Sequence, residues 1–162
     1  MTHAFTAAIA ARDVDALIGS LAPGVVLYSA VTEVPFEGRE VVADIYRSVF
    51  EAFDELRVVD EFESGDTHAF FWQGPMGGRA VWGADRVRLD ADGKVREITV
   101  VGRPMSGVAT FLTEIGPRLA RRRRGGLVGK LLRYTALPLP AMLGSLDPVS
   151  RWILNQPRAR AK

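Results

Sequence analysis

Hydrophobic positions in the first half of the chain recur at helical spacing and then change to the pattern of strands. Residues 4–21 carry two short apolar stripes, and Asp13 stands between them where its carboxylate would cap the second helix. Pro23-Gly24 predicts the end of that helix, and the β-rich run 25–31 predicts a strand. Gly38 then introduces a wide apolar stripe over 41–53 with charged residues opposite it, which predicts an amphipathic helix lying on a large apolar surface.

Four β-rich segments follow this helix at close intervals. They cover 56–64, 67–74, 79–89 and 95–101, and the connections between them are short and contain glycine. Short connections join antiparallel neighbours, because parallel strands need long crossovers. The sequence therefore predicts an α+β fold, in which N-terminal helices lie on one side of a curved antiparallel sheet.

The last third of the chain has a different character. Residues 105–120 predict a helix that Gly116-Pro117 threatens to break, and a short amphipathic helix follows over 127–133. Asp147-Pro148 predicts the start of a last helix. We therefore divide the chain into a domain over 1–104 and an amphipathic, arginine-rich helical extension over 105–162.

Charge is also distributed unevenly along the chain. Residues 1–115 hold 10 Lys and Arg against 18 Asp and Glu, whereas residues 116–162 hold 11 against 1. The chain has no cysteine and two histidines, which excludes disulfides and thiolate chemistry and argues against a metal site. Composition indicates a globular protein, and we expect it to be cytoplasmic because no targeting or spanning segment is visible.

Asp85 is the most informative single residue. Along its predicted strand it shares one side of the pleat with Val81, Val87 and Leu89, so it points toward the apolar face. A buried carboxylate must be paired, hydrogen-bonded or protonated. Asp85 is therefore either a structural acid tied to nearby donors or the acid–base group of a pocket. Trp82 lies on the other side of the same strand.

The order of elements, with helix starts at Asp13-Val14-Asp15 and Gly38 and a hairpin turn at Asp92-Gly93-Lys94, resembles the SnoaL-like (NTF2-like) proteins. The resemblance covers residues 4–103 and implies a cone-shaped sheet that encloses a pocket for a small apolar molecule. The family includes ketosteroid isomerases, polyketide cyclases, limonene-epoxide hydrolases and members that only bind or dimerise.

The resemblance also suggests roles for individual residues. Asp85 matches the oxyanion-hole acid of the isomerases, while Ser29 stands at the place of their catalytic base and Phe5 at the place of their oxyanion-hole tyrosine. Without that base, steroid isomerisation of the same type is disfavoured. An epoxide-hydrolase site needs an arginine beside its acids, and Arg103 is the candidate partner. Tyr28 and Trp72 are either pocket-lining or core and dimer-face aromatics.

Two functions follow as hypotheses. The first is a pocket that binds a small apolar molecule, with or without cofactor-free acid–base chemistry by Asp85. The second is a non-catalytic module that dimerises through its sheet, while its extension docks to a membrane or a partner. The extension could also pack on its own domain and close the pocket, or lie at the inner face of an anionic membrane; nucleic acid is disfavoured because no binding module accompanies the charge. The candidate contact residues of the extension are Arg121, Arg122, Arg123, Arg124, Lys130 and Arg133.

Overall fold

A side chain caps the N-terminus of each of the first two helices. The computed structural model describes residues 3–145, Pro148 and Trp152. Helix α1 (Ala4–Ala11) is capped by His3, and α2 (Val14–Ser20) by the predicted Asp13, whose Oδ1 accepts from the Ala16 amide at 3.0 Å. The third helix, α3 (Arg39–Ala52), follows Gly38 as predicted and buries one face while its charged residues face outward.

In the described part of the chain, six strands form one sheet in the order β2-β1-β6-β5-β4-β3. The predicted meander is confirmed: neighbouring strands from β3 to β6 pair antiparallel. Only β1 and β6 pair parallel, because the α3 segment and the meander separate them in sequence. The strands are β1 (Leu21–Tyr28), β2 (Phe36–Glu37), β3 (Arg57–Ser64), β4 (Thr67–Met76), β5 (Arg79–Leu89) and β6 (Val95–Arg103).

The first strand differs from the prediction. It begins directly after α2, at Leu21, and ends at Tyr28, whereas the sequence pattern placed it over 25–31. Pro23-Gly24 does not separate helix from strand. It falls where the register with β6 shifts between Leu21 and Val26, and this irregularity accommodates a residue that has no amide hydrogen. The two-residue strand β2 was not predicted.

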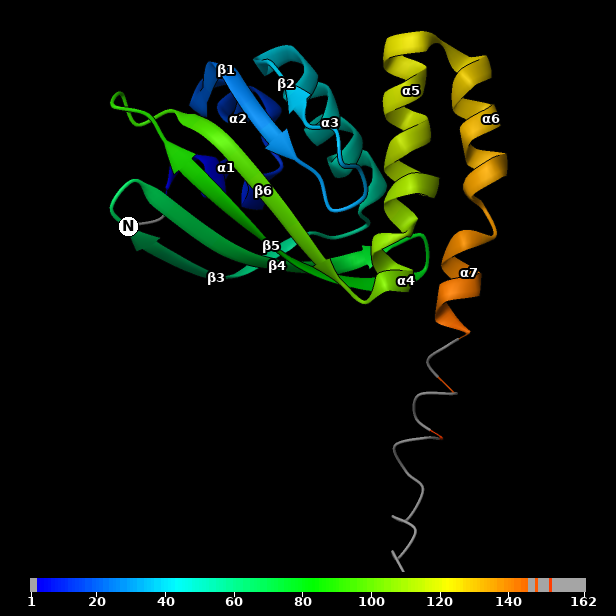
Figure 1. Cartoon of the computed structure of the whole chain (residues 1–162). Coiled ribbons are helices and arrows are strands. Elements are labelled where there is room, and N and C mark those ends of the chain that lie inside the picture. The colour runs from blue at the N-terminus through cyan, green and yellow to red at the C-terminus, as the bar shows by residue number, and fades with distance from the viewer. Residues whose placement is uncertain (1–2, 146–147, 149–151, 153–162) are drawn as a thin grey trace, which may run out of the picture.

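The sheet is curved, and α1, α2 and α3 lie together on one side of it (Figure 1). The core fills the space between these helices and the sheet, with Phe5, Leu17, Val42 and Phe70 fully enclosed. Helix α3 covers the centre of this space, as its wide apolar stripe predicted. The observed arrangement is the α+β cone expected from the sequence.

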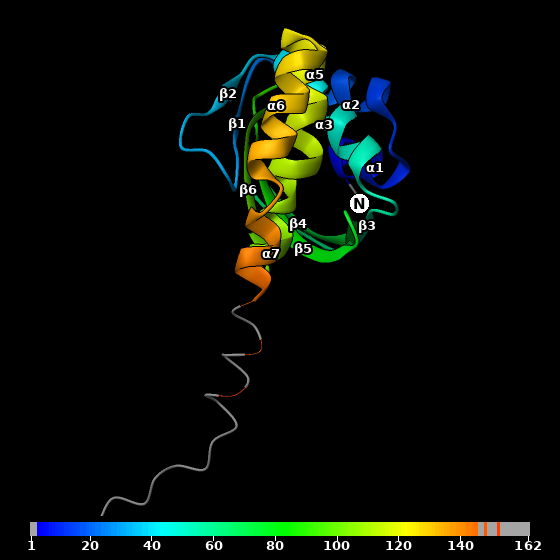
Figure 2. The same ribbon diagram turned by 90° about the vertical axis from the view of Figure 1, so that its right-hand side faces the viewer.

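The described part of the C-terminal extension is mostly helical. It passes through α4 (Met105–Val108), the π-helical turn η1 (Phe111–Ile115), α5 (Gly116–Arg124), α6 (Gly126–Ala136) and α7 (Leu139–Gly144). Pro117 does not break the helix, because it lies in the first turn of α5. Helices α5 and α6 form a hairpin that stands across the end of the sheet beside α3 (Figure 2). The predicted last helix after Asp147 falls largely outside the described residues.

Candidate functional site

Asp85 lies on the concave face of β5 and is 4% exposed. Two side chains donate hydrogen bonds to it: Trp72 Nε1 to Oδ1 at 2.8 Å and Tyr46 Oη to Oδ2 at 3.1 Å. No ion pair to Asp85 occurs among the described residues. The carboxyl group is therefore held by two neutral donors and by no cation.

Trp72 reaches this acid because the facing position on β5 is a glycine. Trp72 and Gly83 are directly paired across β4 and β5. A Cβ atom at Gly83 would lie only 2.2 Å from Cζ2 of the indole, so any side chain there would displace the ring. A glycine inside a strand marks such a close approach, and this signal was available in the sequence but unused.

Tyr46 is the site residue that the sequence analysis missed. It was counted only as part of the apolar stripe of α3, yet its hydroxyl group is buried and bonds to Asp85. The signal that could have found it is chemical, because a buried tyrosine hydroxyl requires a hydrogen-bond partner. Burial and the neighbouring Asp85 charge raise the pKa of Tyr46 well above its ordinary value of 10.0, so it remains a donor.

Desolvation dominates the acidity of Asp85. Burial raises the pKa of its carboxyl group from 3.8 to about 6, although the hydrogen bonds from Trp72 and Tyr46 act in the opposite direction by stabilising the charged form. Because this pKa lies close to neutral pH, the group is mostly a carboxylate at pH 7 but also exists in its protonated form. Such a group can accept and return a proton at physiological pH.

A cavity of about 480 Å³ opens beside Asp85. Its size falls within the roughly 300–1,000 Å³ of small-molecule sites. The wall is almost entirely apolar, with side chains from α3, the sheet, η1 and α5, and Asp85 is its only acidic residue among those described. The exposed lining residues Thr32, Arg123 and Arg124 mark its opening. Among its apolar lining residues are Leu27, Val49, Phe53, Val100, Ile115 and Leu119.

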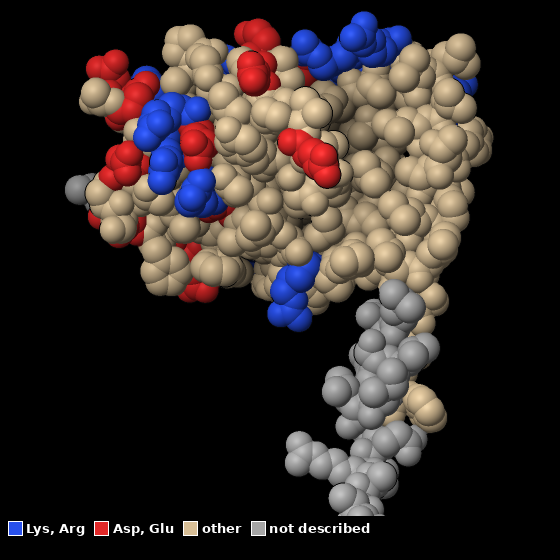
Figure 3. Space-filling model, in the orientation of Figure 1, with Lys and Arg blue, Asp and Glu red and all other residues tan. Residues whose placement is uncertain are grey.

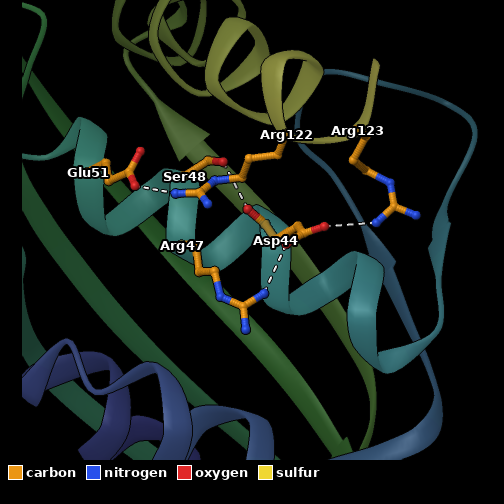
Figure 4. Close-up of polar contacts among 6 residues, drawn as sticks. All are labelled: Asp44, Arg47, Ser48, Glu51, Arg122 and Arg123. Carbon is orange, nitrogen blue, oxygen red and sulfur yellow. Dashed lines mark hydrogen bonds and ion pairs between the residues drawn. The ribbon is translucent and has the colours of Figure 1, made fainter. Parts of the chain in front are cut away.

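The extension contributes one wall of this cavity. Phe111 of η1 stacks on the Trp72 ring with 6.3 Å between centroids, and Leu132 of α6 also lines the space. Ion pairs join α5 to α3: Arg123 Nη1 lies 2.8 Å from Asp44 Oδ2, and Arg122 pairs with Glu51 (Figure 4). The basic extension thus packs on the acidic domain of its own chain.

The other sequence candidates fall in different places. Ser29 and Trp72 line the cavity. Phe5 is fully buried behind the wall, where its ring contacts Tyr46 edge-on, and Tyr28 at the end of β1 is exposed; neither is a lining residue. Both predictions of ligand contact are therefore corrected, because strand parity and the packing of α1 turn these rings away.

Arg103 also requires a correction. It pairs with Trp82 across β5 and β6, and its guanidinium lies 5.7 Å from the centre of that indole ring. Trp82 is on the face of the sheet opposite to Asp85, as predicted, so Arg103 cannot serve as the partner of the acid. Arg122 and Arg123, which were candidates for external contact, face α3 instead. No cluster of potential metal ligands occurs among the residues described.

The fold and the site together define a class of protein: an α+β cone with one desolvated acid on the wall of an apolar cavity. The chain belongs to the SnoaL-like domain family, which matches residues 2–98. A steroid delta-isomerase from Pseudomonas aeruginosa is 28% identical, with a TM-score of 0.64 over 76% of this chain and 89% of that protein.

Two further solved structures share the fold. An uncharacterized protein with a cystatin-like fold from Silicibacter pomeroyi is 23% identical, with a TM-score of 0.65 over 74% of this chain and 82% of its own. A proposed polyketide cyclase from Sinorhizobium meliloti is 17% identical, with a TM-score of 0.51 over 60% and 89%. No curated protein matches the sequence.

Proposed function

We propose that this protein binds a small, largely apolar molecule in the cavity and that Asp85 exchanges a proton with it, in cofactor-free chemistry of the isomerase or cyclase type. The observation that carries the proposal is one buried carboxyl group on a mostly apolar wall, with its pKa raised to about 6. Because no arginine among the described residues bonds to Asp85, and the described lining holds no second acid, this chemistry is favoured over epoxide hydrolysis.

The proposed step uses the carboxylate as the base. Each Asp85 oxygen accepts one bond from the protein, which leaves lone pairs for a ligand. Asp85 takes a proton from a carbon next to a carbonyl group, and the C–H electron pair moves toward the carbonyl oxygen. The protonated acid exchanges this proton with solvent and returns one to the same or another carbon, which restores the carbonyl group and the carboxylate. The resemblance gives the position of the isomerase base to Ser29, so here Asp85 takes that role. The Ser29 hydroxyl lines the cavity and is a neutral donor for the developing oxyanion.

Ligand binding is tested by thermal-shift and calorimetric titration with apolar ketones, including a β,γ-unsaturated steroid ketone. Val49→Trp places a large ring in the cavity, and Val59→Trp on the exposed part of β3 is the matched control. We expect compounds that stabilise the wild type and the control but not the blocked variant. Compounds that stabilise all three proteins equally would place binding outside the cavity.

Proton transfer is tested separately with a compound that binds. Incubation in D₂O and NMR of the ligand should show deuterium at the carbon next to the carbonyl with the wild type, and a loss of at least about 100-fold in rate with Asp85→Asn. A bound ligand that acquires no deuterium above the buffer rate would remove the catalytic half of the proposal. Equal rates for wild type and variant would remove Asp85 from it.

A further inference from the structure

Helix α6 presents an apolar face to the outside of the molecule. Leu127, Leu131 and Tyr134 recur at helical spacing and are 83%, 65% and 74% exposed. Leu137, at the end of α6, and Met142 of α7 are also exposed apolar side chains. In Figure 3 the surface over α5 and α6 is a broad tan area, with Lys and Arg gathered at the end where the two helices join. Surfaces of this kind on a globular protein mark contact sites.

The orientation of α6 is fixed by its opposite face. Gly129 is buried, and a Cβ atom there would lie 2.7 Å from the Pro117 carbonyl oxygen. Leu132 lines the cavity and lies close to Gly116. A rotation of the helix that buried Leu127 would bring a side chain into the place that only Gly129 can occupy. The apolar face is therefore directed outward by the packing of the hairpin.

The charge beside this face is of one sign. Residues 116–145 contain seven Lys and Arg and no Asp or Glu. Arg122 and Arg123 are engaged by α3, but Lys130 and Arg133 are exposed along one flank of the apolar face and make no ion pair within the described part of the chain. A second copy of the same face would add two more cations at the contact and no anion to neutralise them, so self-pairing is electrostatically unfavourable.

An apolar helix face flanked by Lys and Arg fits the boundary of an anionic lipid bilayer, where side chains such as Leu and Tyr enter the acyl region and cations meet the headgroups. None of the described helices is long and apolar enough to cross a membrane. We propose that the exposed face of α6, formed by Leu127, Leu131 and Tyr134 with Lys130 and Arg133 beside it, docks this protein onto an anionic membrane surface. Docking through this face does not depend on what the cavity binds.

Vesicle flotation with the full chain tests the proposal. The wild type should float with phosphatidylcholine vesicles that contain about 30% phosphatidylglycerol, should not float with phosphatidylcholine alone, and should be released by salt. Replacement of Leu127, Leu131 and Tyr134 by Ser together should reduce partitioning at least about tenfold. The double variant Lys130→Gln with Arg133→Gln should produce a loss of similar size.

The control variant removes exposed apolar side chains from another part of the surface. Phe62→Ser with Phe71→Ser alters an exposed aromatic pair on the outer face of the sheet and should leave flotation unchanged. The proposal is overturned if the wild type does not float with anionic vesicles, or if the control loses as much binding as the α6 variants. It is also overturned if sedimentation without vesicles shows a dimer that only the α6 serine variant dissociates, because the face would then join two copies.

Discussion

Replacement of Asp85 by Asn should change the pH dependence of stability in a defined direction. The folded protein holds the Asp85 proton more tightly than the unfolded chain, since its pKa is about 6 rather than 3.8. This group therefore contributes stability below about pH 4 that is lost as the pH rises through 6. A shift of about two pKa units corresponds to about 3 kcal/mol. Asn retains an acceptor for the Trp72 indole but cannot ionise, so the variant escapes this loss.

Urea unfolding of both proteins at several pH values between about 4 and 7 measures the effect. The free energy of unfolding of Asp85→Asn minus that of the wild type should rise by about 2–3 kcal/mol across this range. Asp66→Asn is the control, because hydrogen bonds from Thr67 and Arg96 lower the pKa of this exposed carboxyl group below 3.8, so its difference from the wild type should stay nearly constant over this range and change only below about pH 4. A difference between Asp85→Asn and wild type that stays constant with pH would show that desolvation does not govern the pKa of this acid.

Three other variants test the surroundings of the site. Gly83→Ala should destabilise the fold by roughly 1–3 kcal/mol in urea unfolding, because its Cβ would collide with the Trp72 ring, and an unchanged midpoint would contradict that contact. Tyr46→Phe should cost roughly 1–3 kcal/mol and raise the pKa of Asp85 further, since a donor to the charged form is lost; a lower pKa would contradict the assignment. Arg123→Gln should cost less than about 1 kcal/mol yet speed amide exchange in α5 at low salt, and exchange equal to wild type would show that the ion pair does not hold the hairpin.

The sequence predicted the framework of the fold because hydrophobic spacing reports directly on burial. The stripe of α3 and the hairpin links of the meander indicated a helix packed on an antiparallel sheet, and both are present. The boundaries of β1 were wrong because Pro23 is compatible with a strand when the register shifts beside it. Local propensity does not reveal such a tertiary accommodation.

The site was predictable only in part. Strand parity placed Asp85 on the apolar face, where the structure has it. The donors to it come from α3 and β4, and a contact between distant segments cannot be read from the spacing within either one. The position of Arg103 near the end of the last strand suggested a role beside Asp85, but the alternation of side chains along that strand places it on the outer face. The part of the cavity wall formed by η1 and α5 depends on how the extension folds back.

A carbon-13 NMR titration of the Asp85 carboxyl group, in protein labelled at aspartate and assigned with the Asn variant, measures directly whether this acid is desolvated. We predict a midpoint near pH 6 that rises further when an apolar ligand fills the cavity and removes the remaining water from the acid. A midpoint near 4 that does not respond to ligand would show a solvated carboxyl group that is not part of a binding site.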